Sequence, residues 1–434
     1  MNNYICKGIS GLFIHKYARN KLKLRKSTFL KDVSILSIGT IISQLINIGG
    51  LPFLTRLYNV EEFGNLALFM AFGSIVFSFS TLKLDLAIVK TEKRNEKMAL
   101  IGISFIAIFF LSILATLCLF IWSFWNPQVN SLFLFLMFLF FIANGGSQVL
   151  VYFFSSEKIY QNITFAKVLL AIVNLIFALL LFYWDSSLGL IFAITLANIF
   201  SFLGLGIFFR KEIPSVFKIE KTFSKQILYQ NINFIKFSTP ASFLDILSYQ
   251  IIIIILSVYY SEEITGSFFM SMRVVLLPSA LIGAAIGQVF YKEMSDKFSN
   301  NNLTKNDFWD IWKVLFLIGI IPFVIFLFFG KTLFVWALGD EWMLAGEMAI
   351  ILVIKGFFNF LSSPTSSGFV VINKQHYNLI LTTIRITYTI ILLWVSILRN
   401  DIFVFLRWYT FFEIIQMLIY NFLMLNHLPP LKTE

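Results

Sequence analysis

Charge and histidine are both scarce in this chain. Asp, Glu, Lys and Arg make up only 13% of its 434 residues, against ~25% in typical soluble domains. This deficit excludes a soluble globular protein. The three histidines, His15, His376 and His427, are scattered and have no cysteine or carboxylate at metal-ligand spacing. We therefore expect no metal site and no cofactor, apart from a coupling ion considered below.

Apolar residues stand where the charges are missing. They make up 58% of the chain, which holds 53 phenylalanines and has a mean hydropathy of +0.83. Continuous apolar runs of about 20 residues, the length that crosses a ~30 Å hydrocarbon core, recur from end to end. Continuous runs indicate helices, because barrel strands alternate apolar and polar residues. The sequence therefore predicts an all-α polytopic membrane protein with about twelve transmembrane helices, approximately at 33–55, 64–84, 99–121, 131–154, 163–184, 188–209, 238–258, 264–289, 311–330, 344–368, 377–397 and 402–424.

The lysines and arginines outside these spans fall almost entirely on one side of the membrane. Counted with the amino terminus inside, the cytoplasmic segments hold 24 of them, and the opposite side holds only Arg56, Lys331 and Arg399. The positive-inside rule then places both termini in the cytoplasm. This asymmetry also accounts for the +11 net charge, so no nucleic-acid partner is expected. Cys6 is expected in the cytoplasmic tail and Cys118 in a span, which excludes a disulfide.

Two faint internal repeats divide the spans into halves. Tyr58, Glu61 and Glu62 follow the first span as Tyr259, Glu262 and Glu263 follow the seventh, and Gly64 matches Gly266 after one insertion. The segment EKIYQN at 157 similarly resembles NKQHYN at 373. Parallel repeats of six spans indicate two lobes around a central polar cavity. The predicted organisation is a basic cytoplasmic tail (1–32), an N-terminal lobe (33–209), a basic cytoplasmic linker (210–237), a C-terminal lobe (238–424) and a cytoplasmic tail (425–434).

Four of the predicted spans carry polar residues along one helix face. The seams are Ser37, Thr40, Gln44 and Asn47; Ser238, Ser242, Asp245 and Tyr249; Lys355, Asn359, Ser362 and Ser366; and Asn378, Thr382, Arg385 and Thr389. Such seams serve either as hydrogen-bonding contacts between helices or as the lining of a polar cavity. For the cavity we expect Ser37, Thr40, Gln44, Asn47, Ser242, Asn359 and Thr382.

Charges within the spans favour the cavity. Lys83, Asp85, Lys167 and Glu347 lie near span ends, where side chains reach the interface, and are expected to be structural. Deeper in the membrane lie four cations and two carboxylates: Arg273, Lys355, Arg385 and Arg407, with Asp245 and Glu413. A buried Arg273–Asp245 ion pair is one alternative for these charges. Because cations outnumber acids, the cavity is expected to be cationic and to bind an anionic cargo, for which the arginine fork suits phosphate.

The stretch LPFLTRLYNVEEFGNLALFM (51–70), followed by LKLDLAIV (82–89), resembles the amino-terminal region of polysaccharide flippases. These proteins translocate O-antigen and capsule repeat units and belong to the multidrug/oligosaccharidyl-lipid/polysaccharide (MOP) exporter superfamily. The resemblance implies a cargo of oligosaccharide on a polyprenyl diphosphate, moved from the cytoplasmic to the outer leaflet of the bacterial inner membrane. It also implies alternating access, contact with membrane lipids and other polysaccharide assembly proteins as partners.

A proton or sodium gradient is the expected energy source for this cycle, with Asp245 and Glu413 as candidate coupling residues. Two other functions stay open. A multidrug exporter would share the architecture, although cationic drugs require a cavity of opposite charge. A membrane polymerase or ligase would need a large outer loop and a catalytic constellation, and neither is present in the sequence. We therefore expect a transporter and not an enzyme.

Overall fold

The computed structural model describes residues 28–126, 129–183, 186–218, 220–283, 303–365, 368–371 and 376–428, together with residues 290, 294, 297 and 374. This part of the chain is helical and contains no strand, as the sequence predicts. In the first half the helices are α2 (Thr28–Leu57), α3 (Val60–Ser80), α4 (Leu84–Lys90), α5 (Arg94–Ser123), α6 (Ser131–Ser156), α7 (Tyr160–Leu181) and α8 (Ser186–Phe209).

The second half begins after two short helices. These are α9 (Ile213–Phe217) and α10 (Lys221–Gln230), followed by the π-helix η1 (Phe234–Ser238). The remaining elements are α11 (Thr239–Tyr259), α12 (Glu262–Val275), η2 (Ser279–Gly283), α14 (Lys305–Leu338), η3 (Asp340–Trp342), α15 (Met343–Ser362), η4 (Ser363–Thr365), α16 (Gly368–Val371), α17 (His376–Arg399) and α18 (Ile402–Asn426).

Eleven helices of the described chain are long and apolar enough to cross a membrane. The remaining predicted span, 264–289, is interrupted: α12 ends at Val275 after 14 residues and the π-helix η2 follows. Pro278 gives the physical reason, because proline lacks the N–H that would donate to the carbonyl four residues earlier and its ring crowds that carbonyl. Residues 284–289 of this span lie outside the described part.

The internal repeat corresponds to the start of the second helix in each half. Asn59 caps α3, accepting a hydrogen bond from the Glu62 amide at 2.9 Å and donating its own amide to the Glu62 carboxylate at 2.8 Å. In the second half Ser261 caps α12 and accepts from the Ile264 amide at 3.2 Å. These capping contacts satisfy backbone amides in the first turn, which have no carbonyl partner within the helix. The repeated sequence is thus a helix-start signal used twice.

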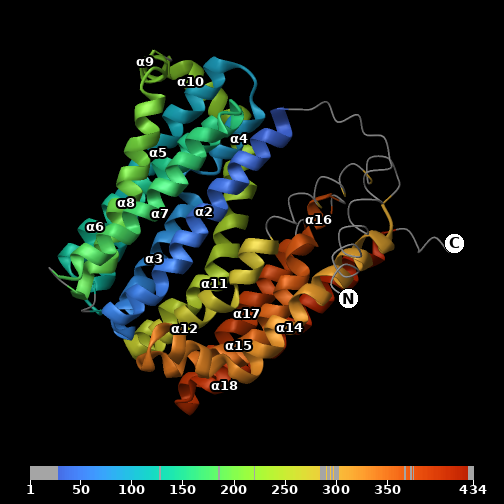
Figure 1. Ribbon diagram of the computed structural model, residues 1–434. Helices are drawn as coiled ribbons and strands as arrows, with labels where there is room; N and C mark the ends of the chain where they lie inside the picture. The colour runs from blue at the N-terminus through green and yellow to red at the C-terminus, as the bar shows by residue number, and fades with distance from the viewer. Residues whose placement is uncertain are drawn as a thin grey trace.

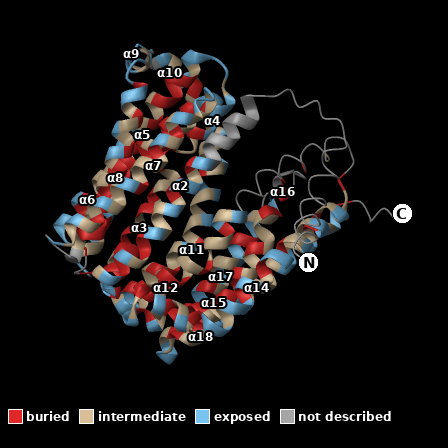
Figure 2. Cartoon of the chain, viewed as in Figure 1, coloured by how far each residue is buried: buried red, intermediate tan, exposed pale blue. Residues whose placement is uncertain are grey.

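Figure 1 shows two groups of helices, α2–α8 and α12–α18, which converge at one end of the molecule and diverge toward the other. We call the converging region the junction end; it contains the α2–α3, α11–α12 and α14–α15 connections. We call the opposite end, with α4, α9 and α10, the basic end. Buried residues concentrate between the helices, and the outward faces are more exposed (Figure 2). The exposed side chains include Phe110, Leu317 and Phe328, which suits a surface covered by lipid.

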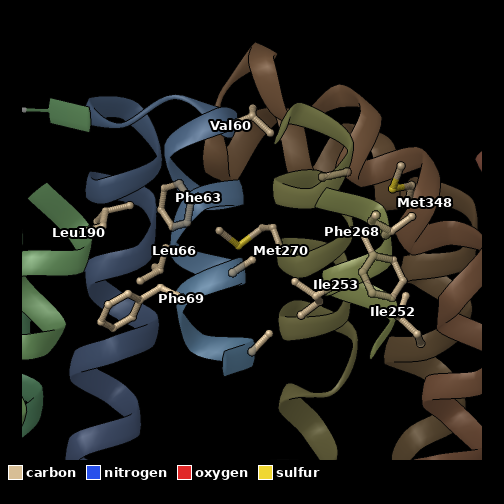
Figure 3. Packing of buried hydrophobic residues seen from close by; sticks show 14 of the residues in the cluster. Val60, Phe63, Leu66, Phe69, Leu190, Ile252, Ile253, Phe268, Met270 and Met348 are labelled. Atoms are coloured by element: carbon tan, nitrogen blue, oxygen red, sulfur yellow. The ribbon is translucent and has the colours of Figure 1, made fainter. Parts of the chain in front are cut away.

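The two groups share one hydrophobic core at the junction end. Side chains from α3, α11, α12 and α15 belong to this cluster, including Phe63, Ile252, Phe268 and Met348 (Figure 3). The fully buried Trp342 packs edge-on against Phe63, with ring centroids 5.0 Å apart, and donates its indole N–H to the Thr55 carbonyl at 3.1 Å. The junction is therefore a packed interface between the halves of the chain.

Two glycines let the backbones of α3 and α12 meet at this junction. A Cβ placed on Gly64 would lie 2.2 Å from the Glu262 carbonyl oxygen, and one on Gly266 would lie 2.0 Å from the Val60 carbonyl oxygen. Both distances are far below van der Waals contact, so glycine alone fits there. The Gly64–Gly266 match in the sequence marks the point where the two repeats cross.

The predicted tails and linker are described in part. Of the tail 1–32, residues from Thr28 onward already form the start of α2, and α18 continues to Asn426 into the second tail. The linker 210–237 forms α9 and α10, and Ile227 of α10 is buried in a core with residues of α4, α5 and α6. Helix α11 packs against both α3 and α17. It therefore contacts both halves of the chain, although the sequence assigned it to the second.

Candidate functional site

A cavity of about 510 Å³ lies between the two halves, lined from α2, α3, α7 and α8 on one side and from α11, α12 and α18 on the other. We call it the inter-lobe cavity. Most of its lining is apolar, for example Leu66, Met70 and Phe268. Its strongest polar groups are Arg273, Asn47, Asn174, Gln250 and Tyr249. A largely apolar chamber with a few polar groups is typical of a binding site for an amphipathic molecule.

Among the described residues that line this cavity, Arg273 is the one that carries a charge. It lies in the last turn of α12 and is partly buried. Within the described chain it has no ion pair, and the carboxylate considered as its partner, Asp245, lies instead 4.0 Å from Arg385. The alternative of an Arg273–Asp245 ion pair is therefore not found. A guanidinium cannot lose its proton at physiological pH, so Arg273 presents an uncompensated positive charge to the cavity.

A buried charge cluster lies behind the cavity and joins α11, α15, α17 and α18. Glu413 is at its centre: its carboxylate lies 3.4 Å from Lys355 Nζ and 3.2 Å from Arg385 Nε, and it accepts the Tyr388 hydroxyl at 2.5 Å. Lys355 also donates to the Tyr409 hydroxyl at 2.8 Å. Lys355 is 3% exposed and Glu413 is 1% exposed. Charges so deeply buried persist only when they are paired and hydrogen-bonded, as these are.

A second cavity, of about 550 Å³, lies on the other side of this cluster and is lined from α11, α15, α17 and α18. Asp245, Arg385, Asn359 and Thr382 line it, as does Tyr249. Tyr249 also lines the inter-lobe cavity, and its ring lies under the Arg385 guanidinium, 4.6 Å from the ring centroid. The tyrosine ring and its stacked arginine therefore stand between the two cavities.

Two of the four cations expected in the central cavity lie outside both cavities. Lys355 lines neither cavity, because it is enclosed by Glu413 and Tyr409. Arg407 is exposed on α18, next to the exposed Trp408, and lines neither cavity either. The expected excess of cations therefore shrinks: Lys355 and Arg385 are balanced by Glu413 and Asp245, which leaves Arg273.

The polar seam of α2 is divided between two uses. Asn47 lines the inter-lobe cavity, and Thr40 accepts a hydrogen bond from Lys167 at 3.0 Å. Gln44 is partly buried and lines neither cavity. The side chain of Ser37 lies outside the described part. Lys167, expected at the membrane interface, is thus a hydrogen-bonding contact between α2 and α7.

The seams of the second half differ in the same way. Asn359 and Thr382, expected in the central cavity between the lobes, line the second cavity instead. Ser242 is partly buried on α11 and lines neither cavity, and Ser366 lies outside the described residues. Of the two candidate coupling carboxylates, Asp245 lines the second cavity with 59% of its side chain exposed. Glu413 is enclosed by its partners and lines neither cavity.

The tyrosines of the cluster are the functional groups that sequence reasoning missed. Tyrosine is counted among the hydrophobic residues of a sequence, yet the Tyr388 hydroxyl donates to Glu413 and the Tyr409 hydroxyl accepts from Lys355. A spacing signal existed: Tyr388 follows Arg385 by three residues and Tyr409 precedes Glu413 by four. Residues three or four apart share a helix face. The spacing therefore places the Tyr388 side chain beside Arg385 and the Tyr409 side chain beside Glu413.

Comparisons with known proteins agree with this architecture. The model of the family described as "Polysaccharide biosynthesis protein" matches residues 53–347. No curated protein matches the chain significantly at the sequence level.

Similar solved structures include "Lipid II flippase MurJ, inward closed conformation", with a TM-score of 0.70 and 14% identity, covering 91% of this chain and 90% of that one. A MOP superfamily transporter from Pyrococcus furiosus has a TM-score of 0.56 and 16% identity, covering 92% and 96% of the two chains. An outward-facing multidrug resistance MATE transporter has a TM-score of 0.53 and 16% identity, covering 91% and 94%. The chain therefore has the fold of MOP transporters. The three solved structures named here are of two transporters and a flippase.

Proposed function

Since the chain belongs to the polysaccharide biosynthesis protein family, we propose that it flips polyprenyl-diphosphate-linked oligosaccharides from the cytoplasmic to the outer leaflet of a bacterial inner membrane. The observation that carries this proposal is the unpaired Arg273 in the inter-lobe cavity. A diphosphate is doubly or more highly charged and cannot cross hydrocarbon without a compensating group. Arg273 offers it a charged, forked donor in an enclosed site.

The rest of the cavity suits the other parts of such a cargo. Asn47, Asn174 and Gln250 carry amide groups that can hydrogen-bond hydroxyls of sugars or oxygens of phosphate. The apolar lining from Leu66, Met70 and other side chains suits the first isoprene units of the lipid. A cationic drug would instead meet the positive charge of Arg273 without a lining carboxylate, which disfavours multidrug export.

The packed junction supports alternating access. Contacts between the halves close the junction end, where Trp342 reaches Thr55 and Asn65 donates to Glu262 at 3.0 Å. The basic end carries most lysines and arginines of the connections and is therefore assigned to the cytoplasm. In this orientation the described state is closed toward the outside. Opening the junction while the basic end closes would carry the cavity to the outer leaflet.

The test of the cargo uses a strain in which this gene is the sole flippase gene for its surface polysaccharide. Loss of the gene is expected to make lipid-linked repeat units accumulate on the cytoplasmic leaflet, with loss of surface polysaccharide. The measurement is extraction of the lipid-linked intermediates together with surface glycan labelling. Unchanged surface glycan in that strain would reject the proposal.

A further inference from the structure

Asp85 is a buried carboxylate that none of the cavities includes. The sequence placed it at a span end, where it was expected to reach the interface, but the structure shows it at 0% exposure in the first turn of α4. It lies at the basic end, just after the turn that joins α3 to α4. Thr81 caps α3, and Leu82 and Lys83 adopt left-handed backbone conformations with φ of 52° and 54°. These angles cost energy for residues other than glycine, so this turn is held by its surroundings.

Only neutral donors of the described chain contact the Asp85 carboxylate. The Leu86 amide donates to Oδ1 at 3.1 Å, and Gln148 Nε2 on α6 makes a short contact with Oδ2. The Thr81 hydroxyl also favours the charged form as a side-chain donor. No lysine or arginine of the described chain forms an ion pair with it at 4.0 Å or less. Glu413, by comparison, has two cations at that range. Asp85 is therefore buried without the compensation that buried carboxylates normally require.

The charged and titratable groups around Asp85 do not replace a counter-ion. Lys83 attracts the carboxylate from its own turn, beyond ion-pair distance, and Tyr152 faces it from α6. Helix α5 carries Lys97, which is paired with Glu157 at 2.6 Å, and η1 carries Lys236, which is exposed. Burial outweighs these influences and raises the pKa of Asp85, while Lys83 acts in the opposite direction.

One unpartnered acceptor lies beside this carboxylate. Gln148 Oε1 is buried and has no hydrogen-bond partner among the described residues. Rotating the Gln148 amide by half a turn exchanges Oε1 and Nε2 at almost the same position. A protonated Asp85 would then donate its O–H to Gln148 Oε1, so that a neutral carboxyl group hydrogen-bonded to an amide oxygen replaces an uncompensated buried charge.

We propose that Asp85 is a proton-binding site, reached from the basic end and linked to the position of α3. The proton adds to one carboxylate oxygen and leaves from it, with no other bond changed. Helix α3 runs from the turn beside Asp85 to the junction, where Gly64 contacts Glu262. A change of charge at Asp85 therefore acts on the helix whose movement opens and closes the junction. Proton binding itself does not depend on which cargo the protein moves.

The test is an infrared titration of the purified full-length protein in lipid. We expect a carboxylic-acid C=O band that persists well above the ordinary pKa range of aspartic acid, around 3.9, and that Asp85→Asn removes. The matched control is Asp310→Asn, which removes a carboxylate whose side chain is 75% exposed and should leave this band in place. A band that Asp85→Asn leaves unchanged would overturn the proposal. So would a midpoint that moves when sodium replaces choline at constant ionic strength, because the site would then hold a metal ion.

A second variant keeps the test open if Asp85→Asn does not reach the membrane. Gln148→Glu places a second carboxyl group beside Asp85, so the pair should share a proton and the midpoint should move to higher pH. An unmoved midpoint would contradict the assignment. In cells, Asp85→Asn should also flatten the pH dependence of export while Asp85→Glu preserves it, and an unchanged pH profile in Asp85→Asn would argue against a role in the cycle.

Discussion

At the scale of single residues, charge compensation separates three kinds of buried ionic group in this protein. Arg273 has no ion-pair partner in the part of the chain that the structure describes, and it lines the inter-lobe cavity. Lys355, Arg385 and Glu413 compensate one another. Asp85 has neutral donors only. The kind of compensation therefore distinguishes three cases, namely a charge available to a ligand, a structural cluster and a site that favours protonation.

Neutralising Arg273 should impair transport without loss of the protein. In Arg273→Gln we expect export to fall at least about 10-fold, because losing one charge-assisted contact to phosphate costs about 1.5–3 kcal/mol. Arg273→Lys should retain part of the activity, since it keeps the charge but loses the planar fork. Export of surface glycan and immunoblots of membrane fractions measure the two quantities separately.

The control for this prediction is Arg407→Gln, which removes an equally permanent charge from an exposed position outside both cavities. It should leave export nearly unchanged. If both variants lower export equally, the effect belongs to net charge and not to the cavity. If Arg273→Gln instead disappears from the membrane, Arg273 is structural.

Removing the centre of the charge cluster should have the opposite phenotype. Glu413→Gln leaves Lys355 and Arg385 buried without their shared carboxylate, and breaking such an arrangement costs about 3–5 kcal/mol. We expect much less protein in the membrane and a lower melting temperature in detergent. Adding Lys355→Met to Glu413→Gln should recover part of the stability, because it removes one of the two stranded charges. No recovery in the double variant would mean that Lys355 and Glu413 are not energetically coupled.

At the scale of helices, the crossing of α3 and α12 is the contact on which closure depends. The crossing needs glycine at two positions, because each Cβ would meet a carbonyl oxygen of the other helix. The caps at Asn59 and Ser261 fix where each helix begins and therefore which residues reach the crossing. Local capping and the contact between the halves are thus encoded in the same short repeated segment.

Gly64→Ala or Gly266→Ala should prevent the junction from closing fully. The backbone atoms that a new Cβ would meet, at 2.2 Å and 2.0 Å, cannot rotate away as a side chain can. We expect a cysteine pair at Asn65 and Glu262 to cross-link efficiently in an otherwise wild-type protein and poorly in either alanine variant. Gly49→Ala is the matched control, because nothing lies within 4 Å of its Cβ position on α2. Equal cross-linking in all of these proteins would show that the junction tolerates a methyl group.

At the scale of the whole molecule, the two halves meet at the junction end and diverge toward the basic end (Figure 1). The alternating-access cycle proposed here requires the two ends to move in opposite senses. The junction end then has to separate at contacts such as the hydrogen bond from Arg56 to the Trp336 carbonyl, 3.5 Å long in this state.

Spin-label distances would test this reciprocity. One pair, on Lys93 and Asp310, spans the basic end from two exposed positions in different halves. The other pair, on Arg56 and Trp336, spans the junction. We expect one distance to shorten as the other lengthens when cargo is added. Distances that lengthen together would indicate separation of the halves and not alternating access.

Much of this architecture was predictable because membrane insertion depends on local properties of the chain. Each span must be apolar and must satisfy its own backbone hydrogen bonds, so the fold class and most helix positions follow from short windows of sequence. The interrupted span was not predicted, although Pro278 was visible. An apolar run looks the same whether its helix is continuous or ends at Val275.

The sequence by itself therefore determined the helical membrane fold, the resemblance between halves and the family, since each depends on residue order along the chain. Only the tertiary structure decided which charges are available. Lys355 and Arg273 are both cations in apolar helices, but Lys355 meets Glu413 and Tyr409 from another helix while Arg273 meets a cavity. Likewise, Asp85 is buried because α6 covers it. Compensation and burial arise between helices distant in sequence, and no spacing within one helix can specify them.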